Sequence, residues 1–316
     1  MAFGSVIRPI LSIWLAVMIN IALQEKTPSP FHFHSTVKAH GWVMLRPFAW
    51  HDETAQLSRL QQLSSGQVVR LSMTERPDSV QIDVEAAQPL ISAEEAEIRQ
   101  AVRRMLRLDE DLSEFYTFYD QLDNWQLKLE PGGGRLLRCA TLFEDIVYTL
   151  CTTNINWSGT IRMVDRLVTA LGQPLPNSSD SLAFPGPADI AATTPDFLKE
   201  HTGLGYRSPY VWELATAVAE GRLDLAAFED PNCPTREVLD NLHRLKGVGP
   251  YAAATILMIL GRYEYLAIDS EMRSFVSKKY FGGERVTPAQ IQNIYALWGR
   301  WQYLAYWFDM PPVALE

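Results

Sequence analysis

The chain has 316 residues, of which 47% are hydrophobic and 21% charged, and its formal net charge is −9. This length and composition are typical of a globular protein with one large domain or two. This negative net charge is unfavourable for binding nucleic acid, because contacts with phosphate dominate the affinity. A small basic face can nevertheless coexist with an otherwise acidic protein surface. Three scattered cysteines (Cys139, Cys151 and Cys233) exclude a disulfide framework or a cysteine zinc site, so a reducing cytoplasm is expected.

Residues 1–30 differ from the rest of the chain. Residues 10–23 are almost wholly apolar, interrupted by Ser12 and Asn20, but this run is shorter than the about 20 residues of a comfortable membrane span. Three interpretations stay open: an extension from an upstream start codon, which we favour, a membrane anchor or signal segment, and a helix packed on the body. The prolines at positions 28 and 30 predict a linker that ends this N-terminal extension.

Residues 31–90 show the period-two alternation of β-strands and predict an antiparallel sheet domain. The strand-like runs are residues 31–36, 41–45, 68–73 and 80–84. Three histidines fall in the first half of this domain (His32, His34 and His40). Because they have no acidic or cysteine partner nearby, solvent-facing histidines are favoured over a metal site.

Residues 91–316 have a helical hydrophobic pattern, so the predicted fold is α+β: a mostly helical domain preceded by the sheet. The helix after Ser92 carries four arginines on the face opposite its apolar residues (Arg99, Arg103, Arg104 and Arg107). This basic face either meets nucleic-acid phosphates or is an ordinary solvated face, and both interpretations stay open. Aromatic residues crowd positions 298–308 and predict a C-terminal helix that is mostly core.

Two polar loops interrupt the helical pattern. Residues 151–157, which include Asn154, separate two apolar runs, and residues 203–210 hold Tyr206 and Arg207 after two glycines. A ring on such a loop can wedge between bases, and a guanidinium can fork onto a base edge. The alternatives are a capped turn around Asn154 and a helix N-terminus with Tyr206 packed inward.

A glycine hairpin lies at Lys246, Gly247, Val248 and Gly249, between an amphipathic helix and an apolar one that starts at Pro250. Glycines allow a turn too tight for a Cβ, and proline is well suited to the first helical position. Free backbone N–H groups and the helix dipole would then bind a phosphate without recognising a base. We predict this helix–hairpin–helix over residues 236–260, followed by a carboxylate, Asp269, at the start of another helix.

The order of helix, Gly-Val-Gly, apolar helix and aspartate resembles the helix-hairpin-helix DNA glycosylases with the Gly/Pro-rich loop and aspartate. The resemblance implies that Asp269 is catalytic, that the hairpin binds DNA phosphate, and that Tyr251 and Thr255 belong to the base pocket. It further implies that Asn154 and Tyr206 enter the duplex, with Arg207 at the orphaned base. The family's bifunctional members carry a lysine where this chain has Tyr251, whereas the 3-methyladenine DNA glycosylase II type has an aromatic there.

The resemblance therefore implies a monofunctional DNA glycosylase of base excision repair, acting on double-stranded damaged DNA as a monomer. Because alkylated purines already have a weak glycosidic bond, an enzyme with only an aspartate can serve them, and we favour that lesion class. The alternatives are an 8-oxoguanine type and a non-catalytic protein that binds damaged DNA. No iron–sulfur cluster is expected, since no cysteine follows Asp269, and a monovalent cation at the hairpin is implied. The expected location is the cytoplasmic nucleoid, with membrane attachment left open by the N-terminal segment.

Overall fold

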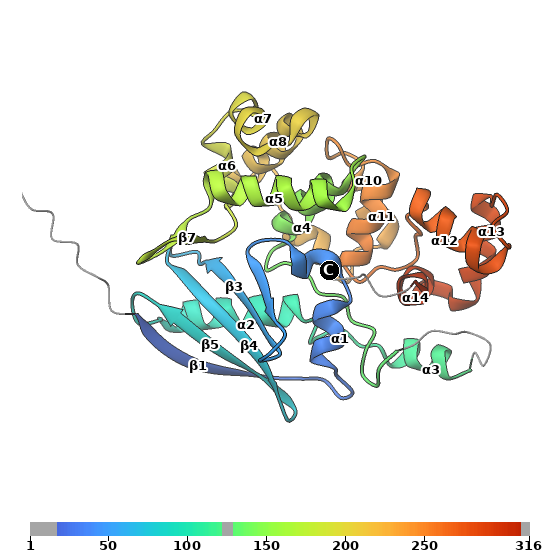
Figure 1. Ribbon diagram of the computed structural model, residues 1–316, viewed down its shortest axis with the longest axis horizontal. Coiled ribbons are helices and arrows are strands. Elements are labelled where there is room, and N and C mark those ends of the chain that lie inside the picture. The colour runs from blue at the N-terminus through green and yellow to red at the C-terminus, as the bar shows by residue number, and fades with distance from the viewer. Residues whose placement is uncertain (1–17, 122–128, 311–316) are drawn as a thin grey trace, which may run out of the picture.

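The structure is a computed structural model that describes residues 18–121 and 129–310. Its N-terminal part is a five-stranded antiparallel sheet in the spatial order β1-β5-β4-β3-β2. The strands are β1 (Ile19–Lys26), β2 (Phe48–His51), β3 (Gln56–Gln62), β4 (Val68–Arg76) and β5 (Ser79–Ala86). Helix α2 (Ser92–Met105) buries Ile98 and Val102 in the same core as Ile82 and Val84 of β5. This sheet, followed by helices, confirms the α+β class predicted from the sequence (Figure 1).

The rest of the chain is mostly helical. The helices are α3 (Ser113–Gln121), α4 (Leu142–Thr152), α5 (Trp157–Leu171), α6 (Pro187–Ala191), α7 (Pro195–Thr202), α8 (Ser208–Ala219), α9 (Ala226–Glu229), α10 (Thr235–Leu242), α11 (Pro250–Ile259), α12 (Ser270–Tyr280), α13 (Pro288–Tyr295) and α14 (Gln302–Asp309), with 3-10 turns η2 (Gly205–Arg207) and η3 (Ala296–Trp301). A short hairpin, β6 (Pro174–Leu175) and β7 (Ser178–Leu182), follows α5. In Figure 1, α4 to α8 lie above the sheet and α10 to α14 lie to the right of it.

The sheet begins earlier than predicted. Strand β1 lies inside residues 1–30, which were expected to be an extension and linker, and it pairs with β5 along its whole length, from Ile19 opposite Ala86 to Lys26 opposite Ser79. The boundary expected at residue 31 is therefore wrong, because the apolar run ends in a strand that completes the sheet. The part of that run before Met18 lies outside the described residues. Among residues 18–121 and 129–310, no helix is both long and apolar enough to cross a membrane.

The run at 31–36, predicted to be a strand, is the start of a helix, α1 (Phe33–Lys38). His32 caps it, because its Nδ1 accepts a hydrogen bond from Ser35 N at 3.1 Å. Phe33, Thr36 and Val37 are buried, which is a helical spacing. The run at 41–45 is likewise a 3-10 turn, η1 (Gly41–Met44). The three histidines are not a solvent-facing group either, since His40 is buried.

The basic face of α2 serves the fold. Arg99 and Arg103 both bind Glu25 of β1, at 2.8 and 3.0 Å. Arg104 pairs with Asp145 of α4 at 2.7 Å, and the buried Arg107 donates to the carbonyl of Met258 at 2.9 Å. These guanidinium groups tie α2 to the sheet, to α4 and to α11. Arg104 and the buried Arg107 therefore fit neither of the two open interpretations, because their partners lie within the protein.

Candidate active site

Helices α10 and α11 flank the glycine hairpin, so the chain here consists of a helix, a glycine turn and a second helix. Gly247 has a φ of 82°, and a Cβ there would lie 2.5 Å from Cδ2 of Tyr210, so this position requires glycine. Gly249 differs, because its φ of −84° is open to any residue and a Cβ would meet nothing within 4 Å. The missing side chain at Gly249 therefore leaves open space in front of the N-terminus of α11, where backbone N–H groups attract anions.

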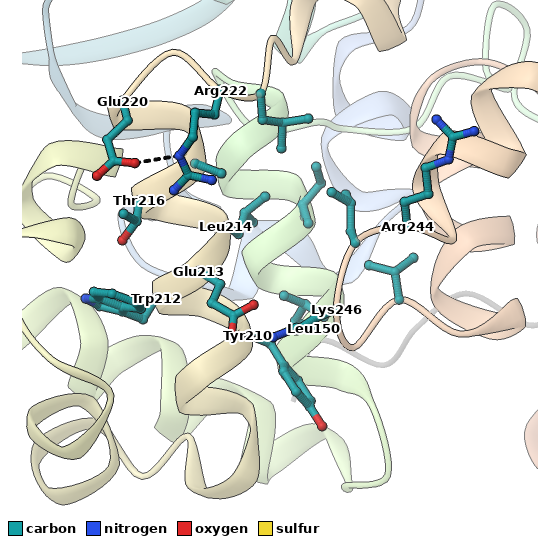
Figure 2. Close-up of a pocket in the computed structure, with 15 residues that line it drawn as sticks. Leu150, Tyr210, Trp212, Glu213, Leu214, Thr216, Glu220, Arg222, Arg244 and Lys246 are labelled. Atoms are coloured by element: carbon teal, nitrogen blue, oxygen red, sulfur yellow. Dashed lines mark hydrogen bonds and ion pairs between the residues drawn. The ribbon is translucent and has the colours of Figure 1, made fainter.

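Lys246, the cation of the hairpin, forms an ion pair with Glu213 of α8 at 2.6 Å. Both residues line a cavity of about 540 Å³ on the α4 and α8 side of the hairpin (Figure 2). Their side chains are 64% and 39% exposed, so solvent screens the pair. Lys246 is thus paired with a carboxylate of a neighbouring helix at the protein surface.

Asp269 is the N-cap of α12. Its Oδ1 accepts a hydrogen bond from Met272 N at 2.8 Å, which fixes the position of the carboxylate. The half-buried side chain also lines a cavity of about 910 Å³. In the described parts of the chain no hydrogen bond to Oδ2 is recorded, so one oxygen holds the helix end while the other can face a ligand.

Aromatic rings form much of the wall of this larger cavity. The rings are Trp42, Trp157, Tyr251, Tyr303, Tyr306 and Trp307. Tyr251 lies in the first turn of α11, and burial raises its pKa, so the phenol is neutral. Thr255, one turn further, lines the same wall. The structure thus brings both residues predicted for a base pocket together with Asp269, and the described lining residues include neither lysine nor arginine.

Trp42 and His40, which sequence reasoning did not place in the pocket, are held there by buried contacts. Trp42 Nε1 donates to Asp145 Oδ1 at 2.9 Å, and Asp145 Oδ2 accepts from Arg104 at 2.7 Å. Although burial opposes ionisation, Arg104 holds the pKa of Asp145 below its usual value. The His40 ring lies 4.0 Å from that of Trp42, and burial lowers its pKa to about 4, so it is uncharged at neutral pH. The pairing of Trp42 with a residue of α4 is a tertiary contact that no local pattern indicates.

The two polar loops meet at the rim of the cavity. Asn154, in the left-handed region with a φ of 49°, donates from Nδ2 to the hydroxyl of Tyr206 at 3.1 Å. Both residues line the cavity, and Tyr206 is 53% exposed. The structure thus brings these two predicted residues together, while their entry into a duplex stays a prediction.

Arg207 has a different environment from its neighbour. It is buried, and its guanidinium donates to the main-chain carbonyls of Leu150 and Thr153 at the end of α4. The same group stacks on the Tyr206 ring at 4.4 Å. In this structure Arg207 therefore supports the loop, while its contact with an orphaned base stays a prediction.

Known proteins similar in sequence are DNA glycosylases. A probable N-glycosylase/DNA lyase of Methanothermobacter thermautotrophicus is 25% identical over 197 residues, which cover 54% of this chain and 60% of that protein. A DNA-3-methyladenine glycosylase of Bacillus subtilis is 24% identical over 223 residues, covering 69% of this chain and 73% of that protein. The match thus spans less than two thirds of the first relative. No protein-family model matches the sequence.

Solved structures with the same fold cover nearly the whole chain. The 3-methyladenine DNA glycosylase of Archaeoglobus fulgidus superposes with a TM-score of 0.71 at 20% identity, covering 91% of this chain and 97% of that one. The 8-oxoguanine glycosylase/lyase of Clostridium acetobutylicum gives a TM-score of 0.65 at 15% identity, covering 92% and 97%. The chain is therefore similar to DNA glycosylases in sequence and shares its fold with solved structures of such enzymes.

Proposed function

We propose that the chain is a monofunctional DNA glycosylase of base excision repair, which hydrolyses the N-glycosidic bond of a damaged, alkylated purine. The observation that carries this proposal is the position of Asp269: a carboxylate fixed by a helix cap, in an aromatic cavity that also includes Gly247 and Gly249 of the hairpin. The same cavity thus contains the Asp269 carboxylate, which would act at the sugar, and the hairpin main chain, which would bind the phosphate backbone. The DNA glycosylase names of the relatives support the same activity.

Binding of duplex DNA follows from the hairpin and the rim. The N–H groups at the start of α11 would hold a phosphate next to Gly249, and Tyr206 with Asn154 would fill the space left by the flipped nucleotide. The cavity, at about 910 Å³, has room for a purine and its sugar between rings on which the base can stack.

The chemistry needs a negative charge at the sugar. As the N-glycosidic bond breaks, positive charge grows on the deoxyribose ring, and the carboxylate of Asp269 stabilises it. The same carboxylate can orient the attacking water and accept its proton. A lyase step would need an amine to form a Schiff base with the sugar, and the family resemblance implies that Tyr251 occupies the position of the lysine of bifunctional members.

The 8-oxoguanine type is the second candidate, because the loops of Asn154 and of Tyr206 and Arg207 resemble those of the 8-oxoguanine DNA glycosylases. Asn154 and Tyr206 are in contact at the cavity rim. Measuring base release from a panel of duplexes with different lesions would identify the substrate. We also propose that the protein acts as a monomer in the cytoplasmic nucleoid. A monovalent cation at the hairpin would bind main-chain carbonyl oxygens beside the open space at Gly249, without side-chain ligands, and would strengthen the hold on phosphate.

The test is base release from duplexes that carry 3-methyladenine, hypoxanthine, 8-oxoguanine or uracil, with and without alkali after the reaction. We expect strand breaks only after alkali. In the variant Asp269→Asn, release should fall about a hundredfold or more, while DNA binding and folding persist because asparagine also caps helices. Asp111→Asn is the matched control, since Asp111 accepts from Ser113 N at 2.9 Å at the start of α3 but does not line the larger cavity. Binding of damaged DNA without release of any base would instead indicate the non-catalytic protein.

A further inference from the structure

The cavity that holds Asp269 contains a second carboxyl group, Glu271. It lies in the first turn of α12, two residues after Asp269, and it lines the same cavity. Glu271 is an exposed residue, so it stands on the open side of the cavity. Whereas Asp269 is held by its capping hydrogen bond, no hydrogen bond or ion pair of Glu271 is recorded in the part of the chain that the structure describes. The helix dipole favours an acidic residue in this turn, but it does not require the side chain to line the cavity.

The surroundings of Glu271 make its carboxyl group a weaker acid than an ordinary glutamate. Although the residue as a whole is exposed, partial desolvation of the carboxyl group and the negative charge of Asp269 both raise the pKa of Glu271. The titratable groups of the other elements around the cavity are Tyr251 of α11, Tyr303 and Tyr306 of α14, His40 before η1, and Tyr206 and Tyr210 near the start of α8. Burial raises the pKa of Tyr251, Tyr303 and Tyr306, so all three are neutral phenols, and His40 is neutral because its pKa is lowered to about 4. None of these groups supplies a positive charge that would keep Glu271 ionised.

Two carboxyl groups whose surroundings separate their pKa values can divide the roles of acid and base. We propose that Glu271 is the general acid that protonates a leaving purine, so that this active site also releases lesions that carry no charge. The inference deepens the proposed function and rests on it. In this mechanism Asp269 stabilises the charge on the sugar and accepts the proton of the attacking water, and Glu271 protonates the departing base.

The proposed step balances without another reactant. The bond between C1′ of the sugar and N9 of the purine breaks, its electron pair goes to the base, and the carboxyl proton of Glu271 goes to a ring nitrogen of that base. Water forms the new bond to C1′ and gives its proton to Asp269. Proton exchange with solvent then returns Asp269 to the carboxylate and Glu271 to the acid.

The two lesion classes need this proton to different extents. A purine alkylated at a ring nitrogen, such as 7-methylguanine, is already cationic and leaves as a neutral molecule. An uncharged purine, such as hypoxanthine, would leave as an anion unless an acid protonates it, and a positioned acid contributes typically about 10²–10⁴-fold to such a step. Glu271 should therefore matter for hypoxanthine and not for 7-methylguanine.

The experiment compares single-turnover release of hypoxanthine and of 7-methylguanine from otherwise identical duplexes, by the full-length protein and by Glu271→Gln. We expect hypoxanthine release to fall about 100-fold or more and 7-methylguanine release to stay within about threefold. For the unaltered protein, hypoxanthine release should decrease as the pH rises through the pKa of Glu271, and the variant should lose that limb. Glu95→Gln, in the first turn of α2 and away from the cavity, controls for loss of a first-turn negative charge.

Every other outcome contradicts the inference. An equal loss for both lesions would mean that Glu271 supports the fold or binding, and an unchanged hypoxanthine rate would remove it from the reaction. Release of 7-methylguanine but not hypoxanthine by the unaltered protein would show that no acid acts here, while leaving the proposed glycosylase intact. Release of neither, nor of the other lesions in the panel, would overturn the proposed function itself.

Discussion

Replacing each hairpin glycine by alanine should separate folding from DNA binding. At Gly247, alanine must adopt a φ of 82° and place its Cβ 2.5 Å from the Tyr210 ring. The left-handed conformation costs about 1–2 kcal/mol and the overlap about 1–3 kcal/mol, so Gly247→Ala should lower the free energy of unfolding by about 2–5 kcal/mol. At Gly249 neither cost applies, because the φ is −84° and no atom lies within 4 Å of the new methyl group. Gly249→Ala should leave stability unchanged or raise it by about 0.4–1 kcal/mol.

DNA affinity should respond differently. The methyl group of Gly249→Ala would occupy the space through which a phosphate approaches α11, and loss of a hydrogen bond to a charged group costs about 1.5–3 kcal/mol. The expected result is a dissociation constant raised about tenfold to a hundredfold. Urea unfolding followed by tryptophan fluorescence measures the first effect, and fluorescence anisotropy of a labelled duplex measures the second. Unchanged DNA affinity in Gly249→Ala, or a stability loss there equal to that of Gly247→Ala, would refute this account of the hairpin.

Three further predictions concern groups around the site. Glu213→Gln frees Lys246 from its ion pair, so DNA affinity should rise severalfold, and the slope of the logarithm of affinity against the logarithm of salt concentration should become more negative by about one. Fluorescence anisotropy across a salt series measures this slope, and an unchanged slope would mean that Lys246 does not reach phosphate. Arg207→Met leaves buried carbonyls at the end of α4 without their donor, so the free energy of unfolding should drop by about 1–3 kcal/mol, and urea denaturation that shows no drop would contradict a supporting role. His40 has its pKa lowered to about 4 in the folded protein, against about 6.5 when unfolded, so its contribution is present above pH 6.5 and is lost as the pH falls toward 4. Unfolding free energies at pH 7 and pH 5 should therefore differ by about 2 kcal/mol from this group alone, and His40→Gln should reduce that difference.

The hairpin was predictable because its signals are local. Gly247 has a positive φ, which the tight turn itself requires, and Pro250 occupies the first position of α11. Asp269 caps the next helix by accepting a hydrogen bond from the main-chain N–H of Met272, three residues later. Each of these preferences acts within about four residues, so the sequence pattern contains it. The same holds for the buried helix α4 and the polar loop after it, where Asn154 lies.

The sheet domain was harder because its elements depend on distant partners. An apolar run such as residues 10–23 suits a helix, a signal segment or a strand. The pairing of its last residues, from Ile19 on, with the distant strand β5 decides the outcome. His32 is not a common capping residue, so the start of α1 carried no recognisable signal. Arg104 looked like part of a solvated face because its partners, Asp145 and Glu229, lie far along the chain.

The Asp145 carboxylate joins three parts of the molecule. It accepts hydrogen bonds from Trp42 of the cavity wall, from Arg104 of α2 and from the main-chain N–H of Cys139. Buried networks of this kind lose most of their value when one member is removed, because the remaining groups stay desolvated and unpaired. The orientation of the Trp42 ring is therefore coupled to the position of α2 on the sheet. That ring is part of the surface on which a base would stack. Under the proposed function, a substitution in α2 or in the sheet would therefore change the surface on which a base stacks without altering a residue of the hairpin.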